Sequence, residues 1–71
     1  MTTEFIIDHH GAKVWKVNGM RHRVNGPAIE WPNGVKSWYL NDKWYSFNRY
    51  CQKLYGKGWR QAQTFILLKL Q

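Results

Sequence analysis

The sequence predicts an α+β protein: an antiparallel β-hairpin meander that forms a single sheet, packed by a C-terminal helix. Two observations support this fold class. Asn-Gly pairs stand between runs of alternating apolar residues, and the apolar period changes after Tyr45. Alternation with a period of two is typical of strands, whereas apolar residues three and four positions apart indicate a helix. The last segment is expected to be either a helix or a returning strand.

The strands are expected near residues 3–8, 12–17, 20–24, 28–32, 35–40 and 43–45. Residues 18–19 and 33–34 are both Asn-Gly, and each pair is expected to form a two-residue type I′ turn, because both residue types accept a positive φ. Residues 41–42, Asn-Asp, are a weaker version of the same turn. Pro27 is expected to interrupt the ladder, since proline has no N–H to donate.

Two-residue turns would fix the register and therefore which side chains share a face. Around residues 33–34, Ile29 would face Trp38 and Trp31 would face Lys36. The face expected to form the core carries Trp15, Val17, Met20, His22, Ile29, Trp31, Trp38, Leu40 and Tyr45. The opposite face is basic and aromatic, and carries Lys16, Arg21, Arg23, Glu30, Tyr39 and Trp44.

An amphipathic helix is predicted after Tyr45, with Ser46 as its N-cap and Gly56 just beyond its end. Its apolar stripe consists of Phe47, Tyr50, Cys51 and Leu54. This stripe is expected to cover the sheet face that carries Trp15 and Trp38. For the following TFILLKL, at residues 64–70, a returning strand is favoured over a continuing helix.

The first 45 residues contain an internal repeat. Its period is 23 residues, by which Ile6, Gly11, Lys13, Trp15 and Asn18 recur as Ile29, Gly34, Lys36, Trp38 and Asn41. One supersecondary unit is therefore used about one and a half times. We expect one domain over residues 1–71, with the meander at 1–45 and a basic helical cap segment at 46–71.

The motif W…NG…HR…NGPA, within residues 10–45, resembles the MORN-type repeat (membrane occupation and recognition nexus). It is most similar to the divergent form in small bacteriophage and giant-virus proteins. The resemblance implies consecutive hairpins in one elongated sheet and a phage origin, and it supplies no activity. Residues 41–46 read NDKWYS where the family would read NGKxHR, which implies a short array that caps itself.

Charge and cysteine usage narrow the class of partner. The chain has a net charge of +7; residues 1–35 hold four basic and three acidic residues, whereas residues 36–71 hold seven basic residues and Asp42 alone. A cationic half favours an anionic partner, namely nucleic acid, an acidic protein or a membrane surface. Cys51 is the single cysteine, which fits a reducing compartment, and we expect a cytoplasmic protein. FILLKL is too short to span a bilayer.

No catalytic residues, cofactor or metal site are expected. His9 and His10 follow Asp8 in DHHG, which favours a turn over metal ligation. His22 would face Trp15, and the repeat places Tyr45 at the equivalent position, which favours packing over acid–base chemistry. The four carboxylates of the chain form no pair suited to hydrolysis.

The predicted function is binding of RNA or single-stranded nucleic acid by a small non-enzymatic protein. Phosphate contacts are expected from Lys16, Arg21, Arg23, Arg49, Lys53, Lys57 and Arg60, and base stacking from Tyr39, Trp44 and Trp59. Tyr39 and Trp44 fit a stabilising cross-strand pair equally well.

The alternative is an inhibitor or adaptor that docks on an acidic host protein, such as a nuclease or a defence component. Trp, Tyr and Arg also dominate protein interfaces, so composition does not separate the two functions. An edge strand at residues 3–8 could also pair between chains and form a homodimer.

Overall fold

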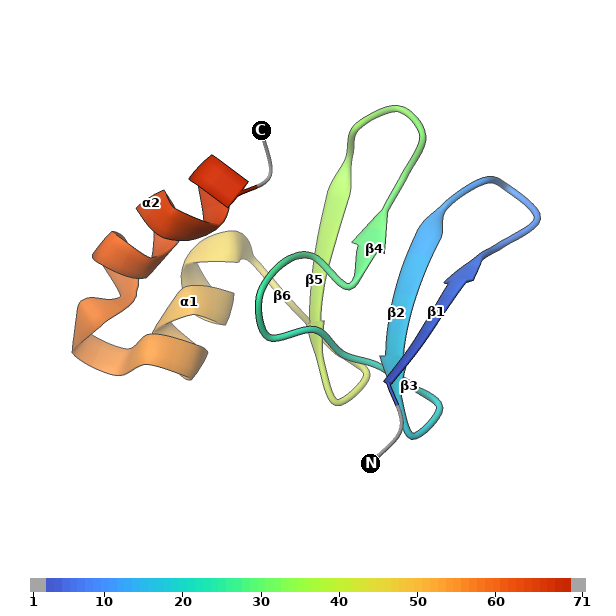
Figure 1. Ribbon diagram of the computed structural model, residues 1–71. Coiled ribbons are helices and arrows are strands. Elements are labelled where there is room, and N and C mark those ends of the chain that lie inside the picture. The colour runs from blue at the N-terminus through green and yellow to red at the C-terminus, as the bar shows by residue number, and fades with distance from the viewer. Residues whose placement is uncertain (1–2, 70–71) are drawn as a thin grey trace.

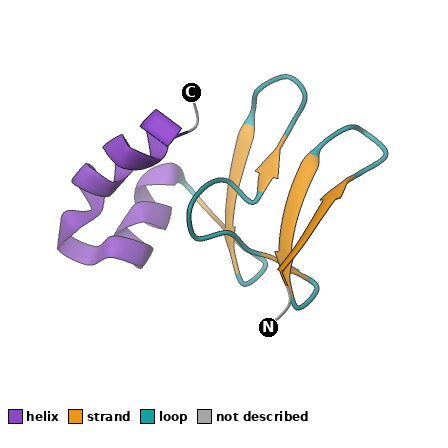
Figure 2. Ribbon diagram, in the orientation of Figure 1, coloured by secondary structure: helices purple, strands orange, loops and turns teal. Residues whose placement is uncertain are grey.

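The computed structural model describes residues 3–69 and shows an antiparallel sheet with two helices packed at one end (Figures 1 and 2). The strands are β1 (Thr3–Ile7), β2 (Lys13–Val17), β3 (Met20–Arg21), β4 (Ile29–Glu30), β5 (Lys36–Leu40) and β6 (Lys43–Tyr45). The helices are α1 (Phe47–Tyr55), the short 3₁₀ helix η1 (Gly56–Gly58) and α2 (Trp59–Lys69). The α+β class, with a hairpin meander packed by a C-terminal helix, is confirmed.

The sheet has the order β1-β2-β4-β5-β6, and β3 also pairs with β2. β3 occupies one end of β2, where Arg21 faces Lys16, and β4 occupies the other end, where Glu30 faces Lys13. Between β3 and β4 the chain leaves the sheet over residues 22–28. The strands expected at 20–24 and 28–32 therefore have only two residues each, as β3 and β4. Both pair with the same strand, β2, and the loop over residues 22–28 separates them.

Two of the three predicted tight turns have the expected geometry. Asn18 and Gly19 both have positive φ, 53° and 80°, as a type I′ turn requires. Asn41 and Asp42 likewise have φ values of 51° and 70°. The registers that these turns fix are confirmed, because β3 pairs with β2 and β6 pairs with β5 as the two-residue loops require.

The predicted two-residue turn at residues 33–34 is wrong. The Trp31 N–H donates to the Val35 carbonyl at 2.9 Å, so the loop has three residues, Pro32 to Gly34. Gly34 has a φ of 90°, whereas Asn33 is not among the residues with positive φ. Proline fits the first position of a type I turn and glycine the left-handed position after it, which together make a three-residue hairpin loop.

The first repeat has the same loop, 23 residues earlier. The Asp8 N–H donates to the Ala12 carbonyl at 2.9 Å, and Gly11 has a φ of 83°. The side chain of Asp8 accepts hydrogen bonds from the backbone N–H groups of His10 and Ala12, which holds this turn together. The sequence repeat is thus also a structural repeat of hairpin loops.

The extra loop residue shifts the β4–β5 register by one, and a shift of one exchanges the faces. Ile29 faces Ser37, not Trp38, so Ile29 and Trp31 lie on the face opposite to Trp38, contrary to the expectation. We call the face that carries Lys16, Arg21, Ile29, Tyr39 and Trp44 the outer face. The helix-side face carries Trp15, Val17, Met20, Trp38, Leu40 and Tyr45.

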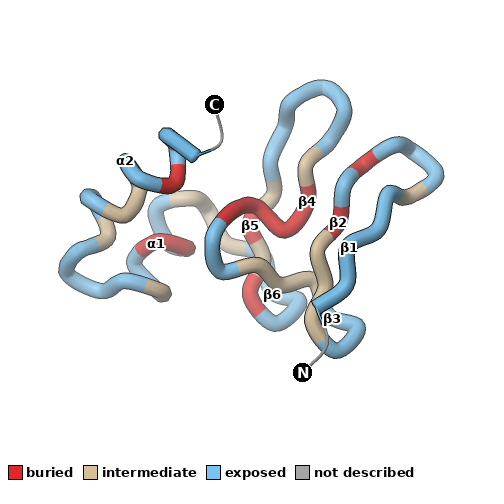
Figure 3. The backbone as a smooth tube through the Cα atoms, in the orientation of Figure 1, coloured by how far each residue is buried: buried red, intermediate tan, exposed pale blue. Residues whose placement is uncertain are grey.

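The predicted helix forms where expected, as α1. The Ser46 side chain accepts from the Arg49 N–H, and Gly56 ends the helix with a φ of 57°. Tyr50 and Cys51 are fully buried, and they form the main core with Trp38, Leu40 and Ile66 (Figure 3). The Trp38 ring stacks on Phe47 at 4.4 Å between centroids.

The favoured returning strand near residues 64–70 is wrong, because the described part of it, up to Lys69, is helical. η1 reverses the chain, and α2 then packs against α1 and inserts Ile66 into the core beside Trp38. A helix satisfies its backbone hydrogen bonds within itself, so this segment needs no partner strand.

The helices cover only part of the helix-side face, which corrects the expectation that they cover Trp15 as well. Trp15 packs instead with Phe5, whose ring centroid lies 4.9 Å away, and with Arg23. A second, smaller core lies on the outer face, where Ala12, Val14 and Ile29 are buried and Tyr39 packs against them. The outer face is therefore partly structural.

Candidate functional site

Four of the predicted binding residues come together on the outer face. Lys16 and Arg21 are cross-strand partners, and Tyr39 and Trp44 are partners in the next hairpin. The Arg21 guanidinium carbon lies 4.2 Å from the centroid of the Tyr39 ring, which joins the two pairs through a cation–π contact. This face therefore presents cations beside aromatic rings, as predicted.

The charge of Arg21 is balanced inside the protein. Its Nε donates to the Asp42 carboxylate at 2.6 Å. This hydrogen bond lowers the pKa of Asp42 below its usual value and raises the pKa of Arg21. Like charges at the paired positions of Lys16 and Arg21 are unfavourable in a sheet, and the Asp42 carboxylate supplies a negative charge beside them.

An open hollow lies where β6 meets α1. It has a volume of about 240 Å³ and is lined by Lys43, Trp44, Tyr45, Ser46 and Arg49. Trp44 is 59% exposed, and the Lys43 ammonium lies 5.6 Å from the centroid of the Tyr45 ring. The hollow thus combines an accessible indole with two cationic side chains from different elements.

Lys43 was missed as a candidate residue. The turn at residues 41–42 pairs it with Leu40, on the face expected to form the core, so it was not among the outer-face candidates. The signal in the sequence is its position next to Trp44 and six residues before Arg49. A helix that begins immediately after an edge strand brings its first turn close to that strand.

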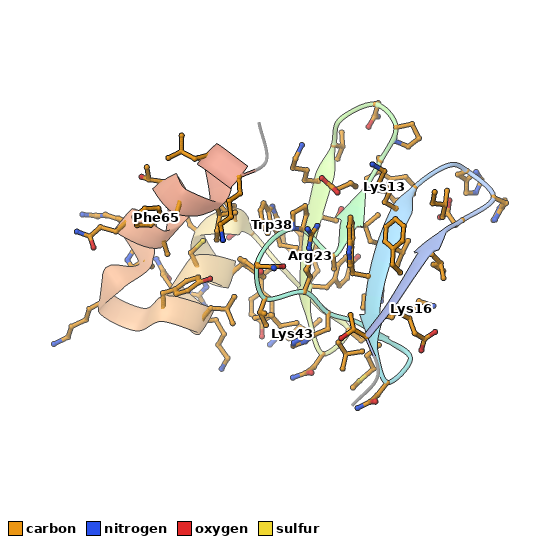
Figure 4. All side chains as sticks on the ribbon, viewed as in Figure 1. Lys13, Lys16, Arg23, Trp38, Lys43 and Phe65 are labelled. Atoms are coloured by element: carbon orange, nitrogen blue, oxygen red, sulfur yellow. The ribbon has the colours of Figure 1, made fainter. Side chains whose placement is uncertain are left out.

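Arg23 does not lie on the outer face, which corrects the prediction. Its guanidinium carbon lies 3.8 Å from the centroid of the Trp15 ring, on the helix-side face. Nη1 donates to the Pro27 carbonyl at 3.0 Å and lies 3.7 Å from the Glu30 carboxylate. Burial lowers the pKa of Arg23. Figure 4 shows Arg23 in the middle of the molecule, and its contacts there indicate a structural role.

The remaining candidates lie on the helices. Arg49, Lys53 and Lys57 are exposed and four residues apart, and Arg60 is exposed at the start of α2. Trp59 is half-buried and packs against the main core, with the Arg60 guanidinium carbon 5.1 Å from its ring centroid. The expected stacking role of Trp59 is therefore limited to the part of its ring that neither contact covers.

The charged side chains on the helical part of the molecule are all positive. Residues 43–69 contain no aspartate or glutamate, and their basic residues are Lys43, Arg49, Lys53, Lys57, Arg60 and Lys69. Such a surface attracts anions over a range set by the screening length of the solution.

The histidines have local roles. Nδ1 of His22 accepts from the Asn41 N–H at 3.0 Å, and the rings of His9 and His10 lie 3.9 Å apart between centroids, tilted by 43°, within their turn. Across residues 3–69, no group of three His, Cys, Asp or Glu side chains is placed to hold a metal ion. Within that same range, no helix has the length and apolar character needed to cross a bilayer.

Comparison of the chain with protein-family models, with curated proteins and with solved structures found no match.

Proposed function

We propose that this protein binds single-stranded nucleic acid, with RNA favoured, at the hollow between β6 and α1 and on the adjoining outer face. The observation that supports the proposal most directly is the lining of the hollow, where an exposed Trp44 lies with Lys43 and Arg49. Unpaired bases stack on exposed aromatic rings, and cations beside the ring hold the phosphates. An open sheet with aromatics suits splayed bases, which favours single strands over duplex.

The proposed path of the strand follows the charge. One base stacks on Trp44, and the flanking phosphates contact Lys43 and Arg49. Lys53 and Lys57 lie further along, on α1 and η1, and extend the cationic surface away from the hollow. Contacts of this kind read the backbone and not the base sequence. The proposal also keeps the phage-type origin and the cytoplasmic location that the motif resemblance and the lone thiol imply.

Replacing Trp44 by alanine is expected to weaken binding of a labelled single-stranded RNA by about fivefold or more, because base–aromatic stacking contributes about 1–3 kcal/mol per base. Fluorescence anisotropy at fixed salt measures the loss. The comparison variant is Trp31→Ala, because Trp31 is also exposed and lies in a different hollow, where the acidic Glu30 stands among Lys13 and Lys36. Equal losses in the two variants would refute stacking at Trp44.

Salt dependence tests the phosphate contacts of the same site. Arg49→Gln is expected to reduce the slope of log affinity against log salt by about 0.7, the value for one phosphate contact on a single strand. Lys69→Gln removes an exposed charge of the same sign at the far end of α2, and is expected to leave the slope almost unchanged. A wild-type affinity that is insensitive to salt would contradict the whole proposal.

Removing the carboxylate of Asp42 is expected to strengthen binding. Asp42 neutralises Arg21 through a 2.6 Å hydrogen bond, so Asp42→Asn makes the full charge of Arg21 available to a phosphate. Asparagine also tolerates the positive φ of 70° at this turn position, so the fold is retained. Affinity should rise about threefold to tenfold, and the salt slope should steepen by up to about 0.7. An unchanged affinity and salt slope in a folded Asp42→Asn protein would show that Arg21 takes no part.

A second candidate function is docking on an acidic host protein, as an inhibitor or adaptor. Exposed apolar side chains on α2 favour it, since Phe65 is 66% and Leu68 is 60% exposed among cations. Figure 4 shows Phe65 on this outermost helix. Capture of a protein partner from nuclease-treated host lysate, together with no affinity for RNA, would support this candidate and refute the first.

A further inference from the structure

The first strand of the sheet, β1, has an open edge. β1 pairs with β2 on one side, and no described strand pairs with its other side. All five of its residues are exposed, as Figure 3 shows along its length. Natural edge strands are usually protected by several charges, a proline or a bulge, but β1 reads TEFII and has Glu4 alone. The edge is therefore competent to pair with another strand.

The direction of the β1 backbone groups can be derived from the neighbouring strand. The Trp15 N–H donates to Ala28, and the Trp15 carbonyl accepts from His22, so both groups point away from β1. Phe5 faces Trp15, and this is therefore a pair without mutual hydrogen bonds. The N–H and C=O groups of Phe5 consequently point outward, as do those of Thr3 and Ile7 by the alternation of the strand.

Self-pairing of β1 has one favourable register. In a two-fold antiparallel arrangement with Phe5 opposite Phe5 of the second copy, Thr3 faces Ile7, and all three outward residues exchange hydrogen bonds. A shift of the axis to Glu4 sets two carboxylates against each other, and a shift to Ile6 sets Glu4 opposite Asp8. Like charges directly opposite are unfavourable in a sheet. The strand is therefore self-complementary in the Phe5-centred register.

Apolar surface next to this edge would be buried by the same pairing. Phe5 is 51% and Ile7 is 62% exposed on the helix-side face, and Ile6 is 41% exposed on the other face. Charge does not oppose the approach, because residues 3–17 hold two acidic and two basic residues. The cationic helices lie at the other end of the molecule, away from β1 (Figure 1).

We propose that the protein forms a homodimer in which β1 pairs antiparallel with β1 of a second copy, about a two-fold axis at Phe5. The two sheets join into one continuous sheet, and the outer faces of both copies lie on the same side of it. This pairing needs only β1 and its neighbours, so it does not depend on nucleic-acid binding.

Sedimentation equilibrium over the micromolar range tests the dimer, with the purified full chain and without nucleic acid. The wild type should show concentration-dependent dimerisation. Ile7→Pro should weaken it by about tenfold or more, because proline removes an outward N–H that has no partner within one chain and so loses two hydrogen bonds per dimer. Ile7→Ala keeps that N–H and is the matched control. A monomer at every concentration, or a dimer unaffected by Ile7→Pro but lost in Phe65→Ser, would overturn the proposal.

Cross-linking tests the register. The Phe5→Cys variant should form an intermolecular disulfide under mild oxidation, because hydrogen-bonded partners in antiparallel strands have Cα atoms about 5.5 Å apart, within disulfide range. Glu4→Cys should cross-link much more slowly, since its partner would be Ile6. The wild type is the negative control, because Cys51 is buried and is not expected to form an intermolecular disulfide. Faster cross-linking at position 4 than at position 5 would refute the Phe5-centred axis.

Discussion

Tyr50→Phe is expected to lower the free energy of unfolding by about 2–4 kcal/mol, a large part of the stability of so small a domain. The Tyr50 side chain is fully buried, and its hydroxyl shares one proton between the carbonyl oxygens of Arg23 and Gly26. These carbonyls belong to the loop over residues 22–28. Phenylalanine fills the same space but leaves both carbonyls unpaired, and this penalty is the origin of the loss. Urea denaturation followed by tryptophan fluorescence measures it.

The matched control for this substitution is Tyr55→Phe. The Tyr55 hydroxyl also donates to a carbonyl of the same loop, that of Val24 at 3.2 Å, but at an exposed site where water can replace it. Its loss should cost less than about 1 kcal/mol. Equal effects of the two substitutions would show that burial of the Tyr50 hydrogen bond contributes nothing.

The pH dependence of stability gives a second readout of Tyr50. Burial raises the pKa of Tyr50 above its ordinary value near 10, and burial also raises the pKa of the Cys51 thiol above 9.0. As pH rises past these ordinary values, the unfolded chain loses the protons while the folded chain keeps them. The free energy of unfolding therefore falls with increasing alkalinity. Tyr50→Phe should make the decrease in the free energy of unfolding shallower above about pH 10. Cys51→Ser should likewise make it shallower in the range that begins near pH 9.

The elements that sequence analysis predicted correctly are those determined by short-range chemistry. Asn18-Gly19 and Asn41-Asp42 form type I′ turns because their residues accept positive φ, and the cap at Ser46 fixes the start of α1. The prediction of a two-residue turn at Asn33-Gly34 was wrong because Pro32 belongs to the loop and lengthens it by one residue. The 23-residue repeat indicated the three-residue loop, since it aligns Gly34 with Gly11, whose loop contains no Asn-Gly pair.

The remaining errors concern long-range packing. The helical state of residues 64–69 depends on Ile66 reaching the core that Trp38 and Tyr50 form, which no local pattern specifies. Arg23 was assigned to the outer face by strand alternation, but the chain leaves the sheet at residue 22, where alternation ceases to apply. In the proposed binding site, the turn at residues 41–42 predicts the face on which Trp44 lies, whereas the proximity of Trp44 to Arg49 depends on how α1 follows β6.

Arg23 and Gly26 are expected to be energetically coupled, and this prediction tests the structural role of Arg23. A Cβ at Gly26 would lie 2.8 Å from the Arg23 guanidinium carbon, closer than atoms normally approach. The guanidinium cannot easily move aside, because it is held over the Trp15 ring and by the Pro27 carbonyl and Asn25 side chain. Gly26→Ala should therefore cost about 2 kcal/mol by overpacking, and Arg23→Ala about 3 kcal/mol through lost hydrogen bonds and packing.

The double variant separates this contact from two independent effects. Once Arg23→Ala has emptied the space, a methyl group at Gly26 has room, so the two losses should add to about 1–2 kcal/mol less than their sum. Gly58→Ala is the matched control, since a Cβ there meets no atom within 4 Å and the residue has no positive φ. Strict additivity of the two losses would show that contact between Arg23 and a Cβ at position 26 contributes no energy. A reduced salt slope in a folded Arg23→Gln protein would instead return Arg23 to the proposed nucleic-acid interface, because glutamine removes the charge that a phosphate contact needs.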